Sequence, residues 1–304
     1  MNSHLENSDL PEILYHYTSQ TGLKGMLNEK TIWASKIHYL NDSKEFAPAL
    51  DLARCELTER IKASTSPVDR SRLELLRDTI DTTYTIEYTI EGVNTCVCCF
   101  SELEDDLSQW RGYGGGSAGF SVGFTREWFT RVKETLGLSL IPCIYEPEDQ
   151  QRLVQDEIDE FLATKAEKEP DYWDRNRSHR HPDRPRTLVP LPHAGNDFAT
   201  RLAQIAPRIK HESFKDEIEW RLVAENVPAF ELCHRPGASM LIPYYNIPIG
   251  DDDKVDSIRE IVVGPTPHPK LSVASVRSLA IAAGLDNPDN ILKTKTTSIP
   301  FRNW

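Results

Sequence analysis

The chain of 304 residues is long enough for one large hydrophobic core or two modest ones. No apolar run approaches the roughly 18–20 residues of a membrane helix, and the polar start, residues 1–11, lacks the pattern of a secretory signal. A flexible tail on a cytoplasmic protein is therefore expected. The 47 acidic side chains outnumber the 35 basic ones and give a net charge of −12, which disfavours binding to nucleic acid by charge alone.

Hydrophobic periodicity along the chain predicts intermixed strands and helices. Alternation of apolar and polar residues predicts strands over residues 13–18, 31–35, 84–90, 95–101, 119–125, 138–145, 217–224, 239–244, 259–263 and 291–298. Helical spacing predicts helices over residues 21–28, 126–136, 196–210 and 272–283, with others that begin near Asp42, at Ser66-Pro67 and at Pro147. No clean βαβ repeat is present, which favours an α+β fold over a doubly wound sheet.

Residues 168–194 differ in composition from the rest, because they hold five prolines and five arginines. Prolines at this density exclude a helix or a central strand. We predict an exposed insertion, either a lid or a substrate-binding arm, in an otherwise single domain over residues 12–304. The alternative is a solvated loop.

The six cysteines favour neither disulfides nor a metal site. Secreted domains that depend on disulfides are usually shorter and denser in cysteine, and most of the cysteines here lie in apolar, strand-like stretches. Strand alternation places Cys98 and Cys99 on opposite faces, which does not suit a shared metal. We expect buried thiols in a reducing compartment and no metal.

The strongest chemical signal is the run Glu217-Ile218-Glu219-Trp220-Arg221. On a strand, Glu217, Glu219 and Arg221 share one face, while the apolar residues share the face that meets the core. The polar face then lines either solvent or a cleft. Two neighbouring carboxylates repel each other, so one of them can have a raised pKa, which suits acid–base chemistry. The alternative is an outer sheet face with a cross-strand ion pair.

Two further segments carry weaker signals. In Tyr15-His16-Tyr17-Thr18, His16 and Thr18 share one strand face and can hydrogen-bond ribose hydroxyls or an amide, although a histidine satisfied within the core is the alternative.

Residues 108–124 pass from aromatics through a glycine run into a strand. Trp110 and Tyr113 can stack on a planar ring, and the face of Gly119, Ser121 and Gly123 permits close approach of a flat ligand. A mobile hairpin loop with core aromatics is the alternative for this segment.

Together these segments resemble the bacterial domain-of-unknown-function 2971 family. The resemblance covers nearly the whole chain and is weakest over residues 147–200. It rests on the ordered set YHYTS (15–19), WASKIHYLNDSKEF (33–46), CFSE (99–102), LSQWRGYG (107–114), GFSVGF (119–124), EIEWR (217–221), IREIVVGP (258–265) and SIPFR (298–302).

That family is distantly similar to ADP-ribosyltransferases of the His–Tyr–Glu kind. The similarity implies mixed, mostly antiparallel sheets around a central cleft with flanking helices, and NAD as the substrate. It implies that His16 binds the adenosine-side ribose, that Tyr113 or Trp110 stacks on nicotinamide, and that Glu219 hydrogen-bonds the nicotinamide ribose. Glu217 would orient the acceptor. The remaining expected NAD contacts are Tyr17, Thr18 and Ser121, with Arg111, Arg221 or Arg302 at the pyrophosphate.

The implied activity is transfer of ADP-ribose to an unknown protein or nucleic-acid acceptor, by analogy as a toxin or phage-defence effector. An NAD glycohydrolase, with water as acceptor, is a close variant. A non-catalytic nucleotide or nucleic-acid sensing module is an alternative, which would use the basic residues 175–186 and Trp173. A degenerate fold that serves as a protein-interaction scaffold is another. The sequence does not indicate an oligomeric state.

Overall fold

A computed structural model describes residues 10–40, 47–83, 94–113, 119–168, 173, 194–250, 257–285 and 292–300. Contacts divide the chain into two compact units. The helical unit comprises Ile37–Thr95 and Ile144–Glu212, and the sheet unit comprises Asn2–Lys36, Cys96–Cys143 and Ser213–Trp304. The predicted strand over 84–90, the predicted cap at Asp42 and nearly all of the proline-rich insertion lie outside the described residues.

The helical unit packs helices α2 (Ala47–Ala63), α3 (Pro67–Thr83), α7 (Pro147–Lys168) and α9 (Ala194–Ile205) against one another. Ser66 caps α3 as predicted, because its Oγ accepts from the backbone N–H of Asp69 at 3.3 Å. The core of the unit is apolar and includes Leu57, Leu76, Ile80, Val154, Ile158 and Phe198.

The sheet unit holds ten strands within the part of the chain that the structure describes, in the order β10-β9-β4-β1-β3-β2-β8-β7, with β6 and β5 attached through β3. Only β9 and β10 pair in parallel, and every other pair of these strands is antiparallel. This confirms an α+β fold with a mixed, mostly antiparallel sheet. The strands are β1 (Ile13–Thr18), β2 (Thr31–Lys36), β3 (Cys96–Ser101), β4 (Phe120–Thr125), β5 (Ser139–Pro142), β6 (Glu219–Ala224), β7 (Cys233–Pro236), β8 (Leu241–Pro248), β9 (Ile258–Val263) and β10 (Lys293–Thr296).

Strand β3 is the branch point of the sheet. Along one edge it pairs with β6 over six residues, from Cys96 opposite Ala224 to Ser101 opposite Glu219. Its other edge is divided between two strands, because β2 pairs with its first residues and β1 meets only its last residue, Ser101. A split therefore opens between β1 and β2 along the middle of β3.

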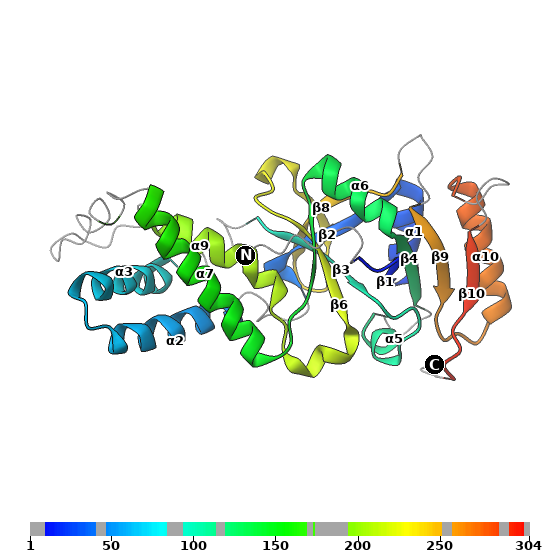
Figure 1. The fold of residues 1–304 in the computed structure, drawn as a ribbon. Helices are drawn as coiled ribbons and strands as arrows, with labels where there is room; N and C mark the ends of the chain where they lie inside the picture. The colour runs from blue at the N-terminus through cyan, green and yellow to red at the C-terminus, as the bar shows by residue number, and fades with distance from the viewer. Residues whose placement is uncertain are drawn as a thin grey trace. The chain divides into compact units, whose positions relative to one another are not determined.

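One face of the sheet carries the main hydrophobic core, with α1 (Gln20–Glu29), α6 (Arg126–Leu136) and α10 (Pro269–Ala282) in contact with its strands (Figure 1). The bounds of α6 are those predicted, because Thr125 caps its start and Gly137 ends it with a φ of 67°. This core includes the buried residues Leu14, Leu27, Phe100, Phe124 and Trp128.

The opposite face carries a smaller cluster of Tyr15, Tyr17, Trp110 and Val262. The short helix α5 (Leu107–Tyr113) contacts β1 there. Sequence periodicity did not predict α5 or β7, both of which are short and polar at several positions. Strand β7 forms one end of the strand order, beyond β8.

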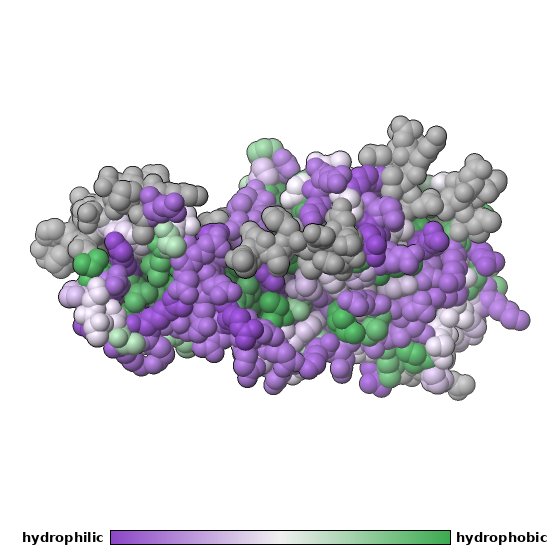
Figure 2. Space-filling model, viewed as in Figure 1, coloured by the Kyte–Doolittle hydropathy of each residue, from purple (hydrophilic) through white to green (hydrophobic). Residues whose placement is uncertain are grey.

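Hydrophilic residues cover much of the face seen in Figure 2, with smaller hydrophobic areas between them. Among the helices that the structure describes, none combines the length and the hydropathy that crossing a bilayer requires.

Candidate active site

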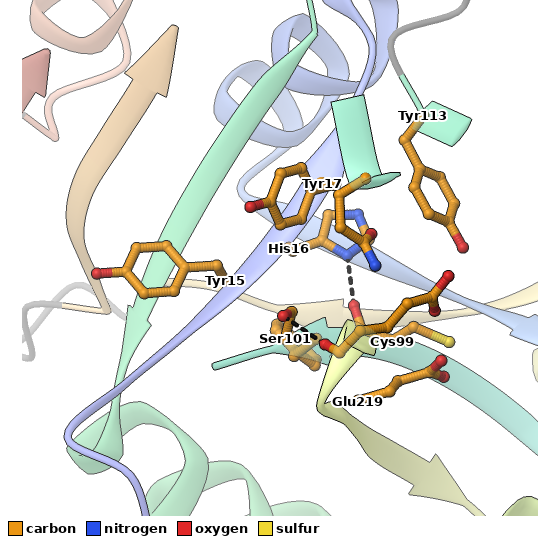
Figure 3. A pocket seen from close by; sticks show the side chains of 10 residues that line it. Tyr15, His16, Tyr17, Cys99, Ser101, Tyr113 and Glu219 are labelled. Atoms are coloured by element: carbon orange, nitrogen blue, oxygen red, sulfur yellow. Dashed lines mark hydrogen bonds between the residues drawn. The ribbon is translucent and has the colours of Figure 1, made fainter. Parts of the chain in front are cut away.

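A pocket lies in the sheet unit where the split in the sheet meets α5 (Figure 3). Its volume is about 30 Å³, which holds little more than a water molecule. The lining mixes aromatic, carboxylate and thiol side chains from β1, β3, α5, the start of β6 and the 3₁₀ helix Glu212–Glu217 that precedes it. These residues are Tyr15, His16, Tyr17, Cys99, Phe100, Ser101, Gln109, Tyr113, Glu217 and Glu219.

The imidazole of His16 on β1 contacts β3 beside the split. Its Nδ1 lies 2.9 Å from the carbonyl oxygen of Cys99, so Nδ1 carries the proton and donates it. The ring also packs against Phe100, with centroids 5.7 Å apart. Burial lowers the pKa of His16 below 6.5, and the bond to Cys99 opposes this only in part. The ring is therefore neutral near pH 7, and Nε2 is a hydrogen-bond acceptor.

The lowered pKa of His16 makes the stability of the fold depend on pH. The unfolded chain takes up a proton at this residue below pH 6.5, whereas the folded chain resists it. The stabilisation is thus complete above pH 6.5 and is lost progressively as the pH falls below 6.5 towards the lower pKa of His16 in the folded state. We expect the unfolding free energy to drop by up to about 1 kcal/mol more in the wild type than in His16→Asn.

Urea unfolding at pH 7.5 and pH 5.5 measures this difference. Replacing the exposed His268 by Asn is the matched control for the loss of one histidine from the chain. A His16→Asn variant with the wild-type pH dependence would contradict the prediction.

Glu219 and Arg221 form a buried ion pair. Arg221 Nε lies 2.6 Å from Glu219 Oε1, and their side chains are 0% and 4% exposed respectively. Arg221 pairs directly with Cys99 of β3, and Glu219 pairs with Ser101. Since directly paired residues of antiparallel strands point to the same side, all four side chains lie on one face of the sheet. Glu219 reaches the pocket, whereas Arg221 does not line it. Arg221 therefore fixes the position of the Glu219 carboxylate from behind.

Glu217 reaches the pocket by a different route from the one predicted. The sequence pattern placed it on the strand, but it ends the 3₁₀ helix Glu212–Glu217, and β6 begins at Glu219. Between them Ile218 has a φ of 42°, a left-handed conformation that breaks the strand alternation. The carbonyl of Glu217 accepts a 2.6 Å hydrogen bond from Ser101 Oγ. The two carboxylates thus come together through a turn instead of through the period of a strand.

The left-handed backbone of Ile218 is strained, because β-branched residues rarely adopt it. Its side chain is 41% exposed, so burial compensates little of that strain. We expect Ile218→Asn to raise the unfolding free energy by about 1 kcal/mol, since asparagine tolerates this conformation. Urea denaturation measures the change. Ile281→Asn, at an exposed position on α10, is the control and should not stabilise the protein. Equal changes in unfolding free energy for the two variants would contradict the proposed strain at Ile218.

Helix α5 separates the two aromatic candidates. Gln109 and Tyr113 are four residues apart, lie on one side of the helix and line the pocket. Trp110 points elsewhere, because it is 2% exposed, packs edge-on against Tyr17 at 4.8 Å and donates from Nε1 to Asp105 at 2.8 Å. Of the two aromatics, Tyr113 alone is placed to meet a ligand in the pocket.

Polar contacts fix α5 at its start. Asp106 Oδ1 accepts from the backbone N–H groups of Ser108 and Gln109 at 2.9 and 3.1 Å, which caps the helix. The hydroxyl of Tyr17 donates to the carbonyl of Leu103 at 2.7 Å and accepts from the Asp106 N–H at 3.0 Å. Tyr17 therefore lines the pocket with its ring while its hydroxyl holds the loop that leads into α5.

Several residues predicted for NAD binding lie away from the pocket lining: Thr18, Trp110, Arg111, Ser121 and Arg221. Arg302 lies outside the described residues. The face of Gly123 and Ser121 is covered, because Tyr15 and Tyr17 pair directly with them across β1 and β4. A Cβ at Gly123 would come within 2.9 Å of Tyr15 and of Ile13. The space above Gly123 is therefore filled by the ring of Tyr15 and not left for a ligand. This corrects the expectation of an open, glycine-lined ligand face.

Five lining residues were not predicted as site residues: Tyr15, Cys99, Phe100, Ser101 and Gln109. In Figure 3 the Tyr15 ring points away from the group formed by His16, Tyr113 and Glu219, and its hydroxyl donates to Glu260 at 2.6 Å. A signal for Gln109 was present in the sequence. Asp106 followed three residues later by Gln109 matches a capping-box pattern, and a helix starting there places Gln109 and Tyr113 on one side.

All six cysteines are free thiols. Cys96 and Cys98 are buried, which raises the pKa of Cys96 to about 12 and that of Cys98 further still. Within the described ranges no three His, Cys, Asp or Glu side chains gather closely enough to hold a metal ion.

The fold and site together define an α+β protein whose mixed, mostly antiparallel sheet is split beside a small polar pocket. A family model described as "Protein of unknown function (DUF2971)" matches residues 109–222, which supports the family indicated by the sequence motifs. The matched segment includes Gln109, Tyr113, Glu217 and Glu219 and ends before β7. Searches of curated proteins and of solved structures find no match.

Proposed function

We propose that this protein binds NAD at the pocket, cleaves the bond between nicotinamide and ribose, and transfers ADP-ribose to an acceptor. One observation supports the proposal most directly: His16 from β1, Tyr113 from α5 and Glu219 from β6 line one pocket. Those are the three residue types, in chain order, that the resemblance to ADP-ribosyltransferases of the His–Tyr–Glu kind implies. Strands splayed around a central cleft, as in that fold, would account for the split beside β3.

The proposed chemistry assigns each group one task. The bond between the nicotinamide nitrogen and ribose C1′ breaks, and its electron pair leaves with nicotinamide. The ribose then carries positive charge, which the Glu219 carboxylate stabilises at close range. The acceptor oxygen or nitrogen forms the new bond to C1′ and gives up its proton, with Glu217 at the pocket as the base. Nε2 of His16 accepts a hydrogen bond from a ribose hydroxyl, and Tyr113 stacks on the nicotinamide ring.

The present pocket volume of about 30 Å³ is too small for a nicotinamide ring. Tyr113 is the side chain that must move to admit one, because it is 36% exposed and ends α5, whereas Gln109 and Glu219 are 6% and 4% exposed. Binding of NAD is thus expected to reposition Tyr113 while the sheet stays in place.

The test is release of free nicotinamide from NAD by the purified protein, measured by chromatography. Release with free ADP-ribose identifies a glycohydrolase, and release with labelled protein or nucleic acid identifies a transferase. No nicotinamide release from NAD, with or without a cell extract as a source of acceptors, would overturn the proposal.

A further inference from the structure

The sheet face that carries the pocket continues across β2, β8 and β7 to a second polar group. Trp33 and Ser35 lie on β2, Tyr244 on β8 and Arg235 on β7. Tyr244 pairs directly with both Ser35 and Cys233, and Arg235 follows Cys233 by two residues, so these side chains share one face. The sequence motifs did not include Arg235, since β7 was not predicted.

The guanidinium of Arg235 is held in position by neutral partners. Its Nη2 donates to Ser35 Oγ at 3.2 Å, and its central carbon lies 5.8 Å from the Trp33 ring centre. Trp33 in turn packs on Tyr244 at 4.7 Å. Within the described part of the chain, no carboxylate forms an ion pair with Arg235, and its buried Nε has no hydrogen-bond partner. A desolvated guanidinium with unused donors is costly unless an anion meets it.

This group adjoins the pocket. Ser35 pairs directly with Val97, and Cys99, two residues further along the same face of β3, lines the pocket. Strand spacing places the Cα atoms of Ser35 and Cys99 about 8 Å apart. Arg221, which is nearer to the pocket in sequence and sheet position, is less suited to a ligand because it is fully buried against Glu219.

We propose that Arg235, held by Ser35 and Trp33, binds the phosphate groups of a nucleotide ligand whose other end enters the pocket. This inference rests on the proposed function for the identity of that ligand. A guanidinium offers a planar fork of N–H donors that matches phosphate oxygens, and Trp33 keeps the fork oriented. The chemical class recognised is a phosphorylated nucleoside.

Calorimetric titration with ADP-ribose and with adenosine, which lacks phosphate, tests this assignment without requiring turnover. We expect Arg235→Gln to weaken ADP-ribose binding about 10- to 100-fold and to leave adenosine binding unchanged. Arg235→Lys keeps the charge but not the planar fork of donors, so its affinity for ADP-ribose should lie between those of the wild type and Arg235→Gln. The control Arg259→Gln removes the same charge from an exposed position on β9 and should bind ADP-ribose as the wild type does.

Equal ADP-ribose affinity in the wild type and Arg235→Gln would overturn the assignment, as would equal losses in Arg235→Gln and Arg259→Gln, or a wild type that does not bind ADP-ribose. Failure of this site is distinguishable from failure of the proposed function. ADP-ribose binding that depends on Arg235, without nicotinamide release from NAD, retains this site and removes the catalytic proposal. If Arg235→Gln changes neither KM nor kcat for nicotinamide release, the catalytic proposal is retained and the phosphate site at Arg235 is removed.

Discussion

Replacing Glu219 by Gln is expected to slow the release of nicotinamide from NAD by about 100- to 1,000-fold, because the developing charge on the ribose loses its carboxylate. The substitution keeps the size of the side chain and a hydrogen bond to Arg221. Single-turnover measurement of nicotinamide with saturating NAD isolates the chemical step. Glu217→Gln is the matched control for the step of bond cleavage, since Glu217 faces the acceptor in the proposed mechanism and not the ribose.

The Glu219→Gln experiment needs a check on folding, because the neutral amide leaves Arg221 as a buried charge. The thermal midpoint of each variant gives that check. Cleavage by Glu219→Gln at the wild-type rate would remove Glu219 from the mechanism. Equal slowing by Glu217→Gln and Glu219→Gln would show that charge stabilisation and proton removal are not divided between the two carboxylates.

Replacing Arg221 by Met is expected to lower the unfolding free energy by about 3–5 kcal/mol, since it leaves the Glu219 carboxylate buried without its partner. Such a loss is a large part of the stability of a typical domain. The double variant Glu219→Leu/Arg221→Met removes both charges and should recover most of the loss, because well-packed apolar residues often replace a buried ion pair at little cost. Urea denaturation of the two variants and the wild type measures all three values.

An exposed ion pair provides the comparison for Arg221→Met. Lys62 and Glu59 lie 2.7 Å apart on α2 with side chains 66% and 71% exposed, so Lys62→Met should change stability by less than about 0.5 kcal/mol. A small effect of Arg221→Met, similar to that of Lys62→Met, would show that the pair near the pocket is not sealed from water. The stable double variant should also lack nicotinamide release, which separates chemistry from folding.

Most regular elements follow from local sequence. The strand over residues 13–18 and the helix over residues 126–136 have the predicted bounds, because apolar periodicity and a Thr125 cap specify them within a few residues. The order of strands in the sheet depends on contacts between distant segments. The branch at β3 joins residues 96–101 to Glu219–Ala224, and no local pattern encodes that pairing.

The candidate site divides in the same way. Alternation placed Glu219 and Arg221 on one face, and the structure agrees. It failed at Glu217, because the left-handed backbone of Ile218 ends the alternation, and an isoleucine gives no sequence sign of that conformation. Arg235 was missed because β7 is only four residues long and mixes polar side chains with proline. Arg235 lies 200 positions after Ser35 in the sequence, so their contact depends on the pairing of distant strands.

The wall of the pocket formed by α5 depends on residues near the end of the described chain. Asp105, which receives the indole N–H of Trp110, also accepts from the backbone N–H of Ser298 at 2.8 Å, 193 residues further on, and from the hydroxyl of Thr297. A nascent polypeptide therefore cannot complete this wall until the ribosome has added Ser298. Until then an incomplete product would carry His16 and Glu219 without a fully anchored Tyr113, so synthesis itself would delay the assembly of the site.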